Sequence, residues 1–212
     1  MARLADPLLE IAVNILVLHT SLNTDHSATR AMAAAYLADT VAAYPDAAVT
    51  EHDLARNPVP HLSPELVPVQ FGAAPEQRTV AVELAETLIT QLEAADLIII
   101  GAPMYNFTVP STLKAWLDHV IRAQRTFSYA TGTPQGLLQP GKRVVAMVAS
   151  GGVYSQGPAQ AMDFVEPYLR TVLGFIGLID VTVIRAEAQA VPDAGPRARA
   201  DAIEHVHALA AA

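Results

Sequence analysis

The sequence predicts a three-layer α/β fold, in which helices cover both faces of a parallel β-sheet. Three observations support this prediction. From residue 13 onward, short apolar runs alternate with longer segments of helical periodicity. Several of the short runs are nearly continuous in valine, isoleucine and leucine, as are strands that are covered on both faces. The 212 residues suit one domain of ordinary size, whose core needs no disulfide.

The first strand, its helix and the second strand follow from their apolar patterns. Residues 13–20, "VNILVLHT", predict a buried parallel strand, and residues 1–12 precede it as an N-terminal leader. A polar loop leads to a helix that begins near Ser27, a favoured N-cap residue, and ends before Pro45. Residues 47–54 have an alternating character, which predicts a second, shorter strand.

Prolines and aliphatic spacing define the middle of the chain. Residues 54–75 contain five prolines, so we expect an irregular cover without a helix or strand. Apolar residues at spacing four predict a helix over residues 75–93, and the aliphatic run at 96–100 predicts the third strand. A helix over residues 110–124 begins at a proline, and residues 125–141 form a loop or hairpin.

The last third of the chain continues the alternation. Residues 142–150, "KRVVAMVAS", predict the fourth strand. A helical stretch follows from about Pro158, is interrupted at Pro167 and ends in the glycines of "LGFIGL". Residues 180–187 predict the fifth strand, and an alanine-rich helix begins near Gly195.

This alternation indicates a single domain over residues 13–212. Strands that alternate with helices pair in parallel, with the helices on both faces of the sheet. Five strands favour the flavodoxin-like order 2-1-3-4-5 over a six-stranded dinucleotide-binding sheet. In such sheets ligands bind beyond the carboxyl ends of the strands, at the switch point between strands 1 and 3. We therefore expect the functional site in the loops that follow strands 1, 3 and 4.

The loop after the first strand predicts an anion site. It is rich in serine and threonine and leads into a helix, whose first N–H groups have no intrahelical acceptor. Ser21, Ser27, Thr29 and the main-chain amide of Ala28 could together bind one phosphate. The loop has neither a G-x-G-x-x-G pattern nor a P-loop lysine, which disfavours a dinucleotide turn and an ATPase. The alternative is that Ser27 is only an N-cap.

The loop after the third strand carries the tetrapeptide "MYNF". Met104, Tyr105 and Phe107 would form a flat, polarizable wall at the rim of the sheet, and Asn106 adds an amide donor and acceptor. This combination suits a planar heteroaromatic ring, whose edge the N–H groups of residues 105–107 could meet. The alternative is that Met104 and Phe107 are core residues beneath the helix.

The loop after the fourth strand contains a pair of glycines and a tyrosine. Gly151 and Gly152 allow positive φ and a close approach of the main chain to a ligand, although a tight turn would explain the pair equally well. Tyr154 is a candidate proton donor to a bound ring or to a substrate oxygen, and it could equally pack as a loop aromatic.

Several motifs together resemble the FMN-dependent NADH azoreductases, which are also quinone reductases of the flavodoxin-like class. These motifs are "APMYNF", the following "STLK", the "SGG" turn with its downstream "GP", "PYL…LGFIG", and the S-x5-S-x-T spacing after the first strand. The resemblance implies one non-covalent FMN per subunit. It implies a phosphate at Ser21, Ser27, Ala28 and Thr29, a ring against Met104, Tyr105, Asn106 and Phe107, and a far ring edge at Ala149, Ser150, Gly151 and Gly152.

The resemblance also implies the reaction and the assembly. NADH or NADPH would reduce the flavin, and a quinone or azo compound would then receive the electrons in ping-pong order. A homodimer would place two sites at its interface, where Phe127, Tyr129 and residues 54–75 would help to wall the substrate pocket. The chain departs from the family at Ala149 and Ser150, where members often have Ser-Arg, so a positive charge is missing there.

Composition and missing motifs exclude other classes. The chain has no cysteine, which rules out disulfides, thiolate metal sites and a cysteine nucleophile. A net charge of −8 without a Lys/Arg cluster argues against nucleic-acid binding. The histidines lack metal-ligand spacing and G-x-S-x-G is absent, so we expect neither a metal site nor a serine hydrolase. No apolar run would span a membrane and no secretory signal is recognisable, so we expect the cytoplasm.

Two other functions stay open at this point. A flavodoxin-like electron carrier would bind FMN without a substrate site of its own, although such carriers usually end strand 3 in an acidic, open loop. A protein of this fold that has lost flavin and acts as a regulator is the other possibility. In the enzyme the cofactor performs the chemistry, so no side chain is required as a nucleophile or general base.

Overall fold

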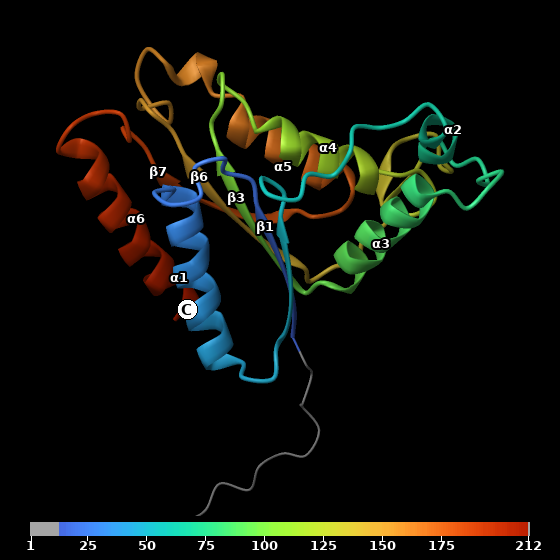
Figure 1. Cartoon of the computed structure of the whole chain (residues 1–212), viewed down its shortest axis with the longest axis horizontal. Helices are drawn as coiled ribbons and strands as arrows, with labels where there is room; N and C mark the ends of the chain where they lie inside the picture. Colours follow the sequence, from blue (N-terminus) through green and yellow to red (C-terminus); the bar gives the residue numbers. More distant parts are fainter. Residues whose placement is uncertain (1–12, 212) are drawn as a thin grey trace, which may run out of the picture.

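A five-stranded parallel sheet forms the centre of the molecule (Figure 1). The computed structural model describes residues 13–211, so the predicted leader lies outside the described residues. The sheet has the order β2-β1-β3-β6-β7, which is the predicted order 2-1-3-4-5 of its strands along the chain. Its strands are β1 (Asn14–His19), β2 (Ala48–Asp53), β3 (Leu97–Pro103), β6 (Arg143–Ala149) and β7 (Asp180–Ala186). The predicted fold class is confirmed.

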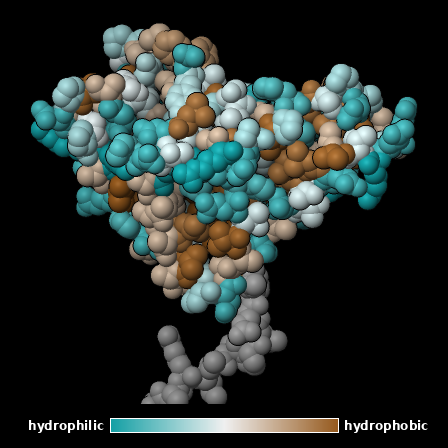
Figure 2. All heavy atoms as spheres, viewed as in Figure 1, coloured by the Kyte–Doolittle hydropathy of each residue, from teal (hydrophilic) through white to brown (hydrophobic). Residues whose placement is uncertain are grey.

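Helices cover both faces of this sheet. The α-helices are α1 (Ala28–Ala43), α2 (Leu66–Gln70), α3 (Val80–Ala94), α4 (Ser111–Val120), α5 (Val165–Phe175) and α6 (Ala194–Ala210). Helices α1 and α6 lie on one face, and α3, α4 and α5 lie on the other (Figure 1). Within the described residues, no helix combines the length and the apolar character that a membrane crossing requires. The outer surface is mostly polar in the view of Figure 2, with apolar residues gathered in patches.

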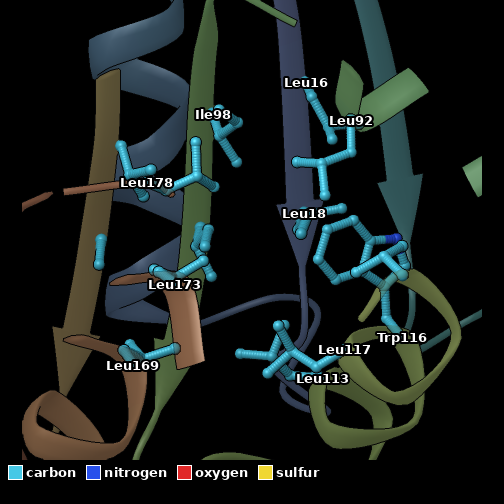
Figure 3. Close-up of a cluster of buried hydrophobic side chains, with 14 of the residues drawn as sticks. Leu16, Leu18, Leu92, Ile98, Leu113, Trp116, Leu117, Leu169, Leu173 and Leu178 are labelled. Carbon is cyan, nitrogen blue, oxygen red and sulfur yellow. The ribbon is translucent and has the colours of Figure 1, made fainter. Parts of the chain in front are cut away.

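Alternating residues of the strands build one core on each face of the sheet. Leu16 and Leu18 of β1 pack towards α3–α5, whereas Ile15 and Val17 pack towards α1 and α6. Figure 3 shows the first of these cores, with Trp116 of α4 beside β1. All seven residues of β3 are buried, which explains the near-continuous hydrophobicity of this segment. Each fully buried aliphatic side chain contributes roughly 1.5–3 kcal/mol, so the two cores hold the sheet rigid beneath its loops.

Two prolines lie inside helices, although the sequence predicted that they would break helical structure. Residues 54–75 were expected to contain no helix, but they include the short helix α2, in which Pro68 is the third residue. Pro167 was expected to interrupt a helix, but it is the third residue of α5. Both predictions are wrong for one reason. N–H groups in the first turn of a helix have no intrahelical acceptor, so a proline there removes no hydrogen bond.

Three other helix boundaries differ from the prediction. Helix α3 begins at Val80, five residues later than expected, because Thr79 caps it by accepting a hydrogen bond from the Val82 N–H at 3.3 Å. Helix α4 ends at Val120, four residues before the predicted end. The stretch from Pro158 contains only the 3-10 helix η1 (Gln160–Met162) before α5 begins.

A small hairpin follows α4 and consists of β4 (Phe127–Ser128) and β5 (Gln135–Gly136). It packs closely against the end of α5. A Cβ atom on Gly136 would lie 2.1 Å from the main-chain nitrogen of Gly177, so only glycine fits this position. The Phe127 ring lies 4.6 Å from the ring of Phe175, measured between centroids. The predicted loop or hairpin is therefore a hairpin fixed to α5.

Candidate functional site

A cleft of about 270 Å³ opens at the carboxyl ends of β1, β3 and β6. This is the edge of the sheet at which the topology predicts a ligand. The predicted site residues that line it are Ser21, Ser27, Ala28, Met104, Tyr105, Ala149, Ser150 and Gly151. The other lining residues, which sequence reasoning missed, are Asn23, His26, Pro103 and Gln189. Three separate loops therefore meet in one place, as the topology predicts.

The first loop supplies hydroxyls and main-chain donors at the start of α1. Ser27 is the N-cap, and its Oγ accepts a hydrogen bond from the Arg30 N–H at 3.2 Å. The same Oγ lies 3.0 Å from Oγ1 of Thr29, which is buried. The N–H groups of Ala28 and Thr29, at the first two helical positions, have no intrahelical acceptor. Ser27 is thus a cap, and the neighbouring N–H groups still suit an anion.

An ion pair between α1 and β2 holds this loop. The Arg30 guanidinium donates to both carboxylate oxygens of Asp53, at 2.8 and 2.9 Å. It also donates to the carbonyl oxygen of Ser21, from Nη2 at 2.9 Å and from Nε at 3.3 Å. The hydrogen bonds from Arg30 are the main reason why the pKa of Asp53 falls to about 2. Arg30 therefore fixes the main chain at Ser21, and Asp53 compensates its charge.

The loop after β3 is a tight turn in an uncommon conformation. Tyr105 and Thr108 exchange main-chain hydrogen bonds of 2.9 and 3.2 Å, and the two residues between them, Asn106 and Phe107, have φ values of 49° and 72°. Asparagine tolerates this left-handed region, but phenylalanine is strained there, as residues at functional sites often are. The Phe107 side chain is 43% exposed, so it is not a core residue, whereas Met104 packs against the core.

Hydrogen bonds of Tyr105 limit which donors this turn can offer. The Tyr105 N–H donates to Thr108, so the predicted use of this N–H as a donor to a ring is wrong. The N–H groups of Asn106 and Phe107 have no acceptor among the described residues. The Tyr105 hydroxyl accepts a hydrogen bond from the Leu22 N–H at 3.1 Å, which joins this turn to the first loop.

In the glycine turn after β6, the carbonyl groups and the free N–H groups point in opposite directions. The carbonyls of Ser150, Gly151 and Gly152 accept hydrogen bonds of 2.9, 3.1 and 3.0 Å from the N–H groups of residues 189, 190 and 188, respectively. In a planar trans peptide the N–H group points opposite to the carbonyl. The N–H groups of Gly151 and Gly152 therefore point away from this segment, and they have no acceptor among the described residues.

A Cβ atom would be crowded at Gly152 but not at Gly151. Neither Gly151 nor Gly152 has a positive φ, so the turn does not use the positive φ that glycine allows. A Cβ atom on Gly152 would instead lie 3.2 Å from the Tyr154 ring. A Cβ atom on Gly151 would lie 3.4 Å from the Cβ atom of Ala190. Gly152 thus lets the main chain approach the Tyr154 ring closely, whereas Gly151 leaves room for a Cβ atom.

Tyr154 lies beside the β3 turn and is held by a carboxylate. Its ring stands edge-on to Phe107, with 6.1 Å between the centroids. The N–H groups of Tyr154 and Ser155 donate to Oε1 of Glu187 at 2.7 and 2.8 Å. The Glu187 side chain therefore fixes the position of the loop that bears Tyr154.

Phe127 and Tyr129 do not line the cleft of their own chain. Phe127 is buried against Phe175 in the hairpin, and Tyr129 is 58% exposed. Residues 54–75 do not line the cleft either. The predicted role of these residues in a substrate pocket would therefore require a second copy of the chain.

The donor set of the cleft fits FMN. Free N–H groups and hydroxyls at the start of α1 suit a phosphate, and Met104 and Tyr105 offer an apolar wall to a flat ring. The free N–H groups of Gly151 and Gly152 suit the polar edge of such a ring. No carboxylate lines the cleft within the described residues, so its walls would not repel an anionic ligand.

Comparisons with known proteins agree with the fold and with FMN as the cofactor. A family profile described as "Flavodoxin-like fold" matches residues 13–210. An FMN-dependent NADH:quinone oxidoreductase of Hyphomonas neptunium is 46% identical over 191 residues, which are 90% of each chain. One of Herminiimonas arsenicoxydans is 50% identical over 181 residues, 84% of this chain and 88% of its own. The crystal structure of an azoreductase from Bacillus anthracis superposes with a TM-score of 0.84 at 26% identity, covering 94% of this chain and 99% of its own.

Proposed function

The chain belongs to the family with the flavodoxin-like fold, and from this premise we propose that it is an FMN-dependent oxidoreductase that uses NADH or NADPH to reduce quinones and azo compounds. Relatives with 46% and 50% identity carry the name FMN-dependent NADH:quinone oxidoreductase. The observation that carries the proposal is the cleft at which the loops after β1, β3 and β6 meet. Its donor set and its apolar wall fit the two halves of FMN.

The phosphate of FMN would bind at the start of α1. Ser21 and Ser27 would contribute their hydroxyls, and Ala28 and Thr29 would contribute N–H groups that lack an intrahelical acceptor. The hydrogen bonds from Arg30 to the Ser21 carbonyl support this assignment, because they fix the loop before any ligand arrives. A preformed loop lowers the entropic cost of binding.

The ring of FMN would lie against residues of the other two loops. Met104, Tyr105, Asn106 and Phe107 would form one wall, and the turn at Ala149, Ser150, Gly151 and Gly152 would meet the ring edge. When bound, FMN would supply two-electron transfer from NADH or NADPH to the acceptor in ping-pong order. The N–H groups of Gly151 and Gly152 would stabilise negative charge at that edge. The rings of Phe107 and Tyr154 would exclude water, and the Tyr154 hydroxyl is the proposed proton donor.

We also propose a homodimer in the cytoplasm, where pyridine-nucleotide donors are found. Exposed apolar side chains in the loops next to the cleft, among them Phe107, Val153 and Phe164, would be covered by a second copy. In that arrangement Phe127, Tyr129 and residues 54–75 of one copy would wall the substrate pocket of the other.

Two measurements test the proposed function. The full-length protein, reconstituted with FMN, should show a flavin absorption spectrum after gel filtration. It should then oxidise NADH or NADPH when menadione or an azo dye is supplied, without another protein. A protein that binds FMN but turns over only slowly would be an electron carrier, which the names of the relatives disfavour. A protein that remains colourless would overturn the proposal.

A further inference from the structure

We propose that His26 is a ligand of the FMN phosphate and makes cofactor affinity depend on pH. This inference rests on the proposed function and concerns the same cleft. His26 lines the cleft together with Ser27 and Ala28, immediately before the N-cap of α1. It therefore lies at the end of the cleft where the helix start offers free N–H groups to an anion.

The main chain of His26 is fixed, and its imidazole is free. Its N–H donates to Oδ1 of Asn23 at 2.9 Å, and its carbonyl accepts a hydrogen bond from Nη1 of Arg199 at 3.4 Å. The residue is exposed, and its ring forms no hydrogen bond with any other described residue. An imidazole in this position can turn towards a ligand without giving up an existing interaction.

Among the described residues that line the cleft, His26 is the one basic side chain. Arg30, on α1, is engaged with Asp53 and with the Ser21 carbonyl. Among the described lining residues, Tyr105 is the other titratable group, and the 149–151 turn and Gln189 contribute none. Asp25 precedes His26 in the same loop, and Arg199 of α6 lies at the main-chain carbonyl of His26. These two residues carry opposite charges, so together they add no net charge beside His26.

A histidine next to the phosphate changes how the site responds to acidity. Histidine ordinarily gains its positive charge between about pH 8 and pH 5. A phosphate monoester holds two negative charges above about pH 6. A protonated His26 would therefore stabilise the bound phosphate most in mildly acid solution. At higher pH the hydroxyls and N–H groups would act without it.

The test compares FMN affinity at two pH values. FMN is titrated into the stripped full-length protein, and the quenching of its fluorescence gives the dissociation constant at about pH 6 and about pH 8. The variants are H26Q, which is always neutral, and H26K, which is charged at both values. H205Q, which removes an exposed histidine of α6, is the matched control. Dividing each constant by that of the parent protein cancels the titration of the phosphate itself.

We expect H26Q to bind FMN about fivefold more weakly than the parent at the lower pH and nearly equally at the higher pH. A fivefold change corresponds to the upper end of the energy that an exposed ion pair contributes. H26K should bind as tightly as the parent at the lower pH and more tightly at the higher one. Riboflavin, which lacks the phosphate, should bind all variants alike. Equal ratios for H26Q at both pH values would refute the role of His26 while leaving the proposed function intact. No FMN binding by any variant would refute the proposed function itself.

Discussion

Replacing Asp53 with asparagine should lower the free energy of unfolding by about 2 kcal/mol near neutral pH. Arg30 is the main cause of the fall in the Asp53 pKa from 3.8 to about 2. Since each tenfold change in proton affinity on folding is worth about 1.4 kcal/mol, the ionised carboxylate stabilises the folded chain by about 2 kcal/mol. Both side chains are mostly buried, at 15% and 19% exposure, so water screens the pair only weakly.

The pH dependence distinguishes this ion pair from ordinary damage to the fold. The pKa of Asp53 is lower in the folded chain than in the unfolded one, so its stabilisation is complete above about pH 4 and disappears as the pH falls towards about 2. About half of it should remain at pH 3. Urea unfolding of the parent, D53N and D46N should therefore show a D53N deficit that shrinks between about pH 7 and pH 3. Asp46 is exposed in a turn, so D46N controls for loss of a charge.

Two results would refute this reasoning. One is a D53N variant that unfolds within about 0.5 kcal/mol of D46N at neutral pH. The other is a deficit of the same size at both pH values. If the reasoning holds, D53N should also bind FMN more weakly, because Arg30 would no longer be held where it fixes the Ser21 carbonyl.

Three further substitutions test other parts of the structure. F107N should leave stability unchanged or raise it by up to about 1 kcal/mol, because asparagine accepts a φ of 72°. It should also raise the KM for the quinone, and a large loss of stability would contradict the proposed backbone strain at Phe107. G136A should lower the free energy of unfolding, measured by thermal unfolding, by about 3 kcal/mol or more, whereas G174A, with no atom near its Cβ position, should be neutral or stabilising. Equal effects of the two substitutions would contradict the close packing at Gly136. E187Q should loosen the loop after β6 and raise the KM more than it lowers kcat, and unchanged kinetics would refute that role.

The three central strands, β1, β3 and β6, could be predicted because they are buried on both faces of the sheet. Continuous aliphatic runs such as residues 97–100 have no other place in a domain of this size, and alternation with helices fixes a parallel order. Helix boundaries were less predictable. Pro68 and Pro167 were read as breaks, although both occupy first turns, and the start of α3 depends on capping by Thr79.

The site was predictable where residues follow a strand directly and unpredictable where tertiary contacts bring them in. Ser21, Met104 and Ser150 lie just beyond strand ends, so topology alone placed them in one cleft. Gln189 reaches the cleft because its segment pairs with the glycine turn. No local sequence pattern predicts this pairing. His26 could have been found from its position beside the N-cap, because N-terminal loops of this kind bind anions.

Hydrogen bonds between main-chain groups hold the glycine turn against residues 188–190. Because peptide groups would supply the donors, the direction of these donors depends on this main-chain pairing and on the Ser150 hydroxyl, which donates to the Gly152 carbonyl at 2.8 Å. A deletion or insertion between Glu187 and Ala190 should therefore not be tolerated, because it would rotate three peptide planes together and point their donors elsewhere.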